Sequence, residues 1–265
     1  MNNLTSLTAV KAYLGIDTTL KDALINLLIP RASVQVQNYC AQEFPTKSYS
    51  GYKMNGTGSD RIILPGPPIL SVSAVQIGST VVTASSDSMT QPGYAFQDYT
   101  LYIIPGAYGQ TNGGVTQFSK GTNNVKVSWV GGYEETETGF IPTGNTIEPT
   151  TGGYAATSIS CEYTANGVAM TLVGSGPSAG EYTFNDGVYG FSTADNGQQV
   201  TMTYYYIPAS VEQATIELIG LKLKQRDNLG IQSKSLAGEQ ITYSDRNMSP
   251  AVQSMLIPYT RRAYS

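Results

Sequence analysis

The sequence predicts an α+β fold. Its parts are a helical core of two N-terminal helices and one long helix in the C-terminal half, a small antiparallel β-sheet, and an inserted all-β domain. Apolar residues recur at helical spacing over 5–40 and 210–227, and they alternate in short runs between Gly-rich turns in the middle of the chain. Hydrophobic residues make up 40% of the 265 residues, enough to build a core, whereas charged residues are only 13%.

Two helices are expected near the N-terminus. Thr5 can cap the first, which runs to residue 14, and Gly15 fits the left-handed position that ends it. Thr19 and Asp22 form a capping pair for the second, which continues to about residue 40. Pro30 lacks a backbone donor and is expected to kink this helix. Its apolar stripe is broad and contains Leu20, Leu24, Leu27, Leu28, Ala32, Val36, Tyr39 and Cys40.

A small antiparallel sheet is expected next along the chain. Residues 59–64 and 69–77 are predicted as two strands joined by a tight turn at 65–68, because that turn is rich in Pro and Gly. Alternating apolar residues predict further strands at 99–104 and 125–130.

The segment 134–199 is rich in Gly, Thr and Ser and is predicted to be the inserted β-domain. Asn-Gly and Asp-Gly pairs are typical of two-residue hairpin turns, and they occur at 166–167, 186–187 and 196–197. The expected strands are 156–164, 168–173, 180–184, 188–192 and 199–206. Aromatic side chains supply either the core, which is the safer interpretation, or an exposed face of this domain; they are Tyr154, Tyr163, Tyr182, Tyr189 and Phe191.

The long helix at 210–227 carries apolar residues on two sides. Ser210 and Gln213 fit a capping box at its start. One stripe is Val211, Ala214, Leu218 and Leu221, and the other is Ile216, Ile219 and Leu223. Either both stripes pack within one domain, or the second forms a subunit interface.

The chain after this helix is polar. A strand is expected at about 240–244, and a last short helix begins at Ser249 and Pro250. A basic aromatic tail follows, with Tyr259, Arg261, Arg262 and Tyr264. Such a tail is either frayed, as expected for an isolated chain, or docked on a partner.

The composition argues against several kinds of chemistry. The chain has no histidine, which removes the commonest general base and the usual zinc ligand. No catalytic, cofactor-binding or metal-binding residue is predicted, and the protein is expected not to be an enzyme. Glu134, Glu135 and Glu137 are expected in a solvated acidic loop, the alternative being weak cation binding.

Charge, cysteines and hydropathy add three expectations. A net charge of −4 without a basic run gives no basis for sequence-independent DNA binding. Cys40 and Cys161 are expected to be buried thiols. No apolar run reaches the ~18 residues that a membrane helix needs, so a soluble protein made in a reducing cytoplasm is expected.

Three segments carry a family resemblance. They are LTAVKAYLGI at 7–16 with DALINLLIPRASVQVQNYC at 22–40, SDRIILPGPPILSVSAVQI at 59–77, and IPASVEQATIELIGLKLKQRDNLGIQSKSLAGEQITYS at 207–244. In this order they resemble the head-tail connector, or head-completion, proteins of tailed bacteriophages, the group similar to the connector of the HK97-like phages. The sequence departs from the compact family pattern in the added segment before Ile207 and in Pro30.

The resemblance implies three parts: a connector core at 1–133 and 200–245, the inserted β-domain at 134–199, and a C-terminal helix and tail at 246–265 that dock on a partner. It implies a structural virion protein at the head-tail interface, assembled in the host bacterial cytoplasm as a homo-oligomeric ring of twelve copies. Its partners would be the portal protein and a downstream neck or tail protein, with no membrane and no cofactor.

In such a ring, genomic DNA would pass through the lumen without specific binding. Tyr259, Arg261, Arg262 and Tyr264 would bind the portal, and Ile216, Ile219 and Leu223 would face a neighbouring subunit. The alternative function is a carbohydrate- or surface-binding β-module of a phage tail or fibre, with tyrosines as its working part. A hydrolase with a hydroxyl nucleophile has no supporting feature.

Overall fold

The structure, a computed structural model, describes residues 3–88, 90–106, 111–150, 152–225, 233–236, 239–242 and 248–260. The chain divides into two compact units, residues 1–42 with 135–265 and residues 43–134. The division expected from the sequence, into a connector core, an inserted domain and a tail, stays a prediction.

The predicted fold class, an α+β fold built on a helical connector core, is wrong. Strands hold 40% of the described residues and helices 24%, so the fold is mostly β. The reason is that two stretches of alternating residues each build a hydrophobic cluster of their own, one around Trp129 and one around Tyr189. The helices form a smaller group that packs around α3 (Ala209–Gln225).

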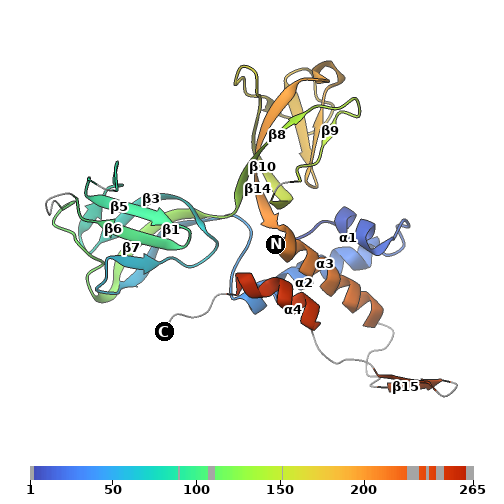
Figure 1. The fold of residues 1–265 in the computed structure, drawn as a ribbon, viewed down its shortest axis with the longest axis horizontal. Helices are drawn as coiled ribbons and strands as arrows, with labels where there is room; N and C mark the ends of the chain where they lie inside the picture. The colour runs from blue at the N-terminus through green and yellow to red at the C-terminus, as the bar shows by residue number, and fades with distance from the viewer. Residues whose placement is uncertain are drawn as a thin grey trace. The chain divides into compact units, whose positions relative to one another are not determined.

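Residues 43–134 form two sheets (Figure 1). The first has the order β1-β7-β3-β4, with β1 (Lys47–Gly56), β7 (Gly121–Gly131), β3 (Ile69–Ile77) and β4 (Thr80–Val82). The second has the order β2-β6-β5, with β2 (Arg61–Ile63), β6 (Thr100–Ile104) and β5 (Gly93–Gln97). On β7, Val125, Val127 and Trp129 alternate with more exposed residues and point into the core of this unit.

The hairpin predicted around 65–68 does not form, because β2 and β3 belong to different sheets. Pro65, Pro67 and Pro68 lack the N–H group that a strand ladder needs, and Gly66 adopts a φ of 95°. The chain therefore crosses from one sheet to the other at this point. Strands β1, β4 and β5 were not predicted, since β1 is mostly polar and β4 and β5 are only three and five residues long.

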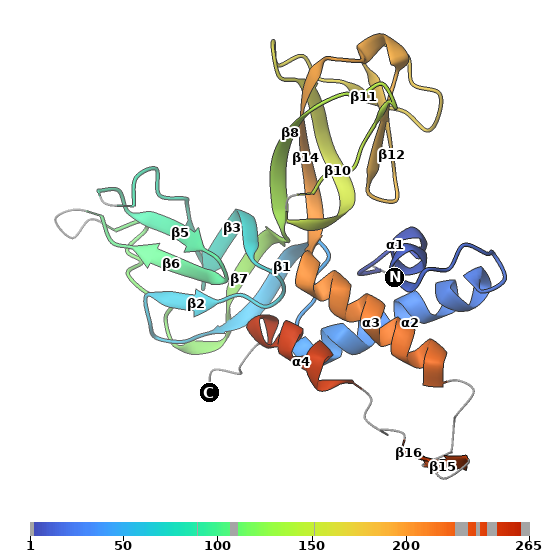
Figure 2. The ribbon, with the colours of Figure 1, turned by 45° about the vertical axis from the view of Figure 1, so that its right-hand side comes forward.

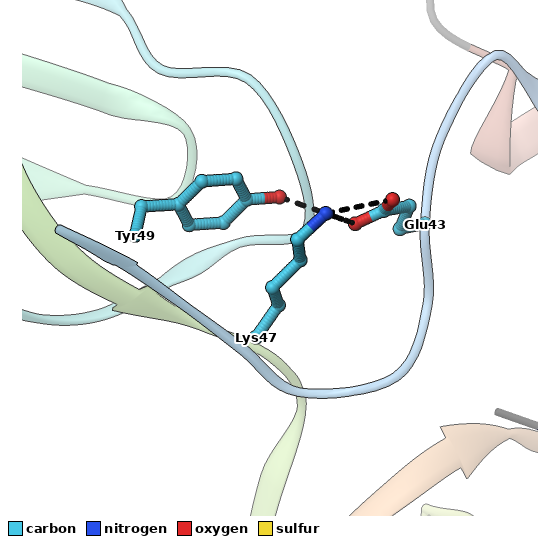
Figure 3. A network of polar contacts seen from close by, with 3 residues as sticks. All are labelled: Glu43, Lys47 and Tyr49. Atoms are coloured by element: carbon cyan, nitrogen blue, oxygen red, sulfur yellow. Dashed lines mark hydrogen bonds and ion pairs between the residues drawn. The ribbon is translucent and has the colours of Figure 1, made fainter. Parts of the chain in front are cut away.

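Figure 3 shows the polar contacts at the start of β1. Lys47 Nζ donates to the two carboxylate oxygens of Glu43 at 2.9 and 2.7 Å, and the Tyr49 hydroxyl donates to Glu43 Oε2 at 3.4 Å. The Tyr49 ring stacks on Trp129 with centroids 4.2 Å apart and planes 9° apart. Because the ion pair is exposed, it contributes at most about 1 kcal/mol, and the aromatic packing is the larger effect.

In the other unit, α1 (Leu7–Leu14), α2 (Asp22–Cys40) and α4 (Pro250–Leu256) all contact α3 (Figure 2). The cap of α1 is Ser6 and not Thr5, since the Ser6 hydroxyl accepts a hydrogen bond from a backbone N–H of the first turn. Gly15 ends α1 with a φ of 63°, as predicted. No side chain caps α2, and the helix continues through Pro30.

Residues 135–208, which we call the β-module, form two sheets. One has the order β10-β14-β8, with β10 (Gly153–Tyr163), β14 (Gln199–Pro208) and β8 (Glu134–Phe140). The other has the order β11-β12-β13-β9, with β11 (Thr171–Leu172), β12 (Glu181–Asn185), β13 (Val188–Phe191) and β9 (Thr146–Ile147). Outside the β-module, β15 (Ser233–Leu236) and β16 (Glu239–Thr242) follow α3 in the sequence and pair with each other as antiparallel strands.

Two of the predicted turns in the β-module differ in outcome. Asp186 and Gly187 have φ values of 53° and 88° and join the antiparallel strands β12 and β13, as expected for a two-residue hairpin. The hairpin predicted at Asn196–Gly197 does not form, because β13 and β14 lie in different sheets. The 3-10 helix η2 (Thr193–Asp195) precedes this crossing.

The solvated acidic loop predicted at 134–137 is also wrong, since these residues begin strand β8. Threonines alternate with the glutamates there and favour the extended backbone. Glu137 accepts hydrogen bonds from the Tyr204 hydroxyl and from Thr150 N, both at 3.1 Å.

Candidate functional site

The long helix α3 lies where the helices and the β-module meet. It contacts α1, α2, α4, β10 and β14. Of the residues predicted as a subunit interface, Ile219 is fully buried and Ile216 is 5% exposed, whereas Leu223 is partly exposed. Only Leu223 therefore has surface to offer a neighbour. The assignment of Ile216, Ile219 and Leu223 to a subunit interface stays a prediction.

The predicted portal-binding residues lie mostly outside the described part of the chain. Tyr259 is partly exposed at the end of the 3-10 helix η4 (Ile257–Tyr259), which follows α4. Arg261, Arg262 and Tyr264 fall outside the described residues. Their portal-binding role stays a prediction.

The side of α2 that faces away from the core was not predicted as a candidate surface. One side of α2 buries Ile25, Ile29, Ala32, Ser33, Val36 and Cys40. On the opposite side Leu27 and Val34 are each 47% exposed, and Leu20, just ahead of the helix, is 89% exposed. We call Leu20, Leu27 and Val34 the outer face of α2. The signal in the sequence is their seven-residue spacing; the apolar stripe predicted for this helix contained Leu20 and Leu27 but not Val34.

A cavity of about 490 Å³ lies between α1, the first turn of α3 and the β-module. Its ionisable lining residues are Glu148, Tyr154, Asp186 and Glu212, and none of the described lining residues is Lys or Arg. Thr5 Oγ1 donates to Glu212 Oε1 at 3.1 Å, and the Tyr154 hydroxyl donates to Asp186 Oδ1 at 3.4 Å. The cavity thus collects negative charge from segments far apart in the sequence.

Two groups that line this cavity, Glu212 and Tyr154, have raised pKa values. Burial raises the pKa of Glu212 to about 7; the Thr5 hydrogen bond opposes this, and Glu148 and Asp186 reinforce it. Burial also raises the pKa of the Tyr154 hydroxyl to about 12, with the charges of Asp186 and Glu212 adding to the effect. Sequence reasoning missed Glu212, because an acid in the first turn of a helix is ordinary.

The β-module is joined to α3 beside this cavity. Gly153 pairs with Pro208, the last residue of β14, and has a φ of 144°. A Cβ at Gly153 would lie 2.2 Å from the Ile207 carbonyl oxygen and 2.6 Å from Ala209 N. Ala209 N, the first residue of α3, donates to Gly152 O at 3.2 Å. Only glycine fits at residue 153, so the two backbones meet closely at this junction.

The tyrosines of the β-module are mainly structural. Tyr182, Tyr189 and Phe191 are at most 4% exposed and belong to its hydrophobic cluster, whereas Tyr154 and Tyr163 are partly exposed. The core interpretation is thus confirmed for three of the five aromatic residues, and these three cannot form an exposed platform.

The cysteines, the possible metal ligands and the hydropathy of the helices were also compared with the predictions for the described part of the chain. Cys40 and Cys161 are buried free thiols, as predicted, and burial raises their pKa values to about 11 and about 12. Within the described ranges, no three His, Cys, Asp or Glu side chains form a group that could hold a metal ion. None of the helices in those ranges has the length and apolar character needed to cross a membrane.

Comparison with known proteins supports one family. Residues 3–105, which span α1, α2 and β1 to β6, match the model of a family described as head completion protein, and this confirms the resemblance. No curated protein matches the chain.

A solved structure described as "Neck of empty GTA particle computed with C6 symmetry" is similar at 12% identity and a TM-score of 0.28. The similar region covers 49% of the present chain and 66% of the chain of the neck structure. The present chain therefore spans just under two thirds of the length of that neck protein. A TM-score this low does not establish a shared fold, so nothing about the present chain is concluded from this structure.

Proposed function

We propose that this chain, whose residues 3–105 match the head completion family, is a structural adaptor at the head-tail interface of a phage-like virion. The family match is the observation that carries the proposal. The segment at 207–244 lies outside the match and also resembles the head-tail connector proteins, so the proposal does not depend on the N-terminal part alone.

The finer proposal is a ring of copies of this chain between the portal and the neck or tail, with DNA passing through its lumen. The outer face of α2 supports it, because Leu27 and Val34, two turns apart on the helix, and Leu20 just ahead of it are exposed apolar side chains. Burying such residues against a neighbouring copy would stabilise a closed ring. The net charge of −4 fits a lumen that does not hold DNA phosphates.

The ring is tested with surface substitutions that leave the core intact. Leu27→Asp and Val34→Asp should keep the monomer folded, since both side chains are 47% exposed, and should abolish rings seen by electron microscopy of the virion vertex or of the assembled protein. Leu223→Asp tests the partly exposed end of the predicted interface. Ile219→Asp is unsuitable, because it buries a charge in the chain's own core. Normal rings in the Leu27→Asp, Val34→Asp double variant would contradict an interface at this face.

Portal binding is tested by removing residues 261–265 alone. A larger deletion from residue 246 would also remove α4, whose Val252 and Leu256 are buried beside α3. The chain ending at Thr260 should fold normally and lose binding to the portal, as should Arg261→Glu with Arg262→Glu. The matched control is Arg31→Glu, an exposed charge reversal on α2. Portal binding that survives the short deletion would contradict the tail's role.

The alternative of a carbohydrate-binding β-module is not favoured by an observation on the structure. Tyr182, Tyr189 and Phe191 lie in the core of the β-module, which leaves them without a face to stack on a sugar. Glycan binding that disappears when the β-module is excised would favour this alternative over the adaptor.

A further inference from the structure

The cavity between α1, α3 and the β-module holds carboxylates that no described lining residue neutralises. Glu148 follows β9, Asp186 lies in the turn between β12 and β13, and Glu212 lies in the first turn of α3. The first two belong to the β-module and the third to the helices. Any negative charge on Glu212 therefore repels the β-module from the helix it packs against.

The polar and titratable groups near Glu212 come from the β-module and from the segment that enters α1. The β-module presents Glu148, Asp186 and the Tyr154 hydroxyl, and the segment entering α1 presents the hydroxyls of Thr5 and Ser6. The cation on α1, Lys11, does not line the cavity and pairs with Asp22 at 2.8 Å. No described group that faces the cavity would therefore compensate a third carboxylate.

Two opposing effects decide whether Glu212 is charged. The N-terminal end of α3 favours the carboxylate, because the helix dipole places partial positive charge at this end. Burial and the two neighbouring carboxylates favour the neutral acid, and they raise the pKa of Glu212 from 4.5 to about 7. The neutral acid still accepts the Thr5 hydrogen bond, so protonation leaves that contact in place.

We propose that this cavity is a proton-controlled joint: protonated Glu212 holds the β-module against α1 and α3, and ionised Glu212 loosens it. In the closed joint Glu212 binds its proton more tightly than it would in water, so closure is favoured at low pH. This stabilisation of the closed joint is lost as the pH rises from 4.5 through about 7. The joint does not depend on the head-tail role, and it would operate in an isolated chain.

The test is hydrogen exchange measured by mass spectrometry on the full-length protein at pH 6 and pH 8. The ratio of exchange rates between the wild type and Glu212→Gln is taken for peptides covering 148–155 and 186–189, because the intrinsic effect of pH cancels in this ratio. With a pKa near 7, opening should increase up to about tenfold between the two pH values, and about threefold after allowance for partial solvent exposure. Glu217→Gln, on α3 but outside the cavity lining, is the control and should follow the wild type.

Asp186→Asn provides a second measurement. Asparagine tolerates the φ of 53° at this turn, and removing the charge should lower the pKa of Glu212 and move the transition below pH 7. Two results would overturn the proposal: exchange ratios that are equal at pH 6 and pH 8, or a transition that Asp186→Asn leaves in place. If Glu212→Gln fails to fold, the shift produced by Asp186→Asn decides the question alone.

Discussion

Replacing Gly153 by alanine should destabilise the junction between the β-module and α3. The loss in the free energy of unfolding should exceed the cost of backbone strain alone. Its φ of 144° lies in a region that only glycine adopts readily, which costs alanine about 1–3 kcal/mol. The added Cβ would also lie 2.2 Å from Ile207 O and 2.6 Å from Ala209 N. Both contacts are with backbone atoms, which cannot rotate away as a side chain can. We therefore expect a total loss of about 3–5 kcal/mol in the free energy of unfolding.

Gly167→Ala is the matched control. Gly167 also has a positive φ, 68°, but a Cβ there would have no neighbour within 4 Å. Its backbone strain of about 1–2 kcal/mol is partly offset by about 0.4–1 kcal/mol, because alanine reduces the entropy of the unfolded chain. The difference between the two variants then reports the close backbone approach at Gly153 together with the greater strain of its φ of 144°.

The assay is thermal unfolding followed by the near-ultraviolet circular dichroism of the tyrosines. For a unit of this size, about 1 kcal/mol shifts the Tm by about 2–4 °C, so Gly153→Ala should lower it by about 10 °C. Trp129, the one tryptophan in the sequence, lies in residues 43–134 and reports that unit separately. A Gly153→Ala variant that unfolds no earlier than Gly167→Ala would show that the junction tolerates a side chain, contrary to the geometry.

Three further predictions concern buried polar groups and thiols. Replacing the buried Asp195 by alanine should lower the free energy of unfolding, measured in urea, by about 2–3 kcal/mol, because the Tyr163 hydroxyl and the Gly180 backbone N–H lose their acceptor; Asp195→Asn should cost less. Ser33→Ala removes the acceptor 3.0 Å from Leu4 N and should cost about 1–3 kcal/mol by the same measurement, and an unchanged urea midpoint would contradict it. Cys40 and Cys161 should resist a thiol reagent at pH 8 and both react in denaturant, since burial keeps them as unreactive thiols; rapid labelling of the native protein would show that they are accessible.

Features set by neighbouring residues were predictable from the sequence. Gly15 ends α1 because a residue without a Cβ enters the left-handed region easily. Asp186 with Gly187 forms the hairpin turn because Asp tolerates a positive φ and Gly adopts it without strain. The alternation along β10 and β14 predicted both strands. The resemblance to the head-completion family was likewise visible, and the match over 3–105 confirms it for the part that holds the first two of the three segments.

The fold class was missed because weak strands carry little periodic signal. β1 has two tyrosines and a methionine among polar residues, and β8 alternates Glu with Thr, so neither resembles a strand of a buried sheet. Both are stabilised by a partner strand distant in sequence, β7 for β1 and β14 for β8. A propensity that depends on the neighbouring strand cannot be evaluated from the segment alone.

The sequence by itself determined where the helices and the best strands lie, that Gly15 and Gly187 turn the chain, and which family its N-terminal part resembles. Only the tertiary structure decided that α3 buries Ile216 and Ile219, that α2 keeps Leu27 exposed, and that Glu148 and Asp186 stand beside Glu212. The physical reason is that hydrophobic periodicity records which sides of an element are apolar, whereas burial and pKa depend on what the rest of the chain places against those sides.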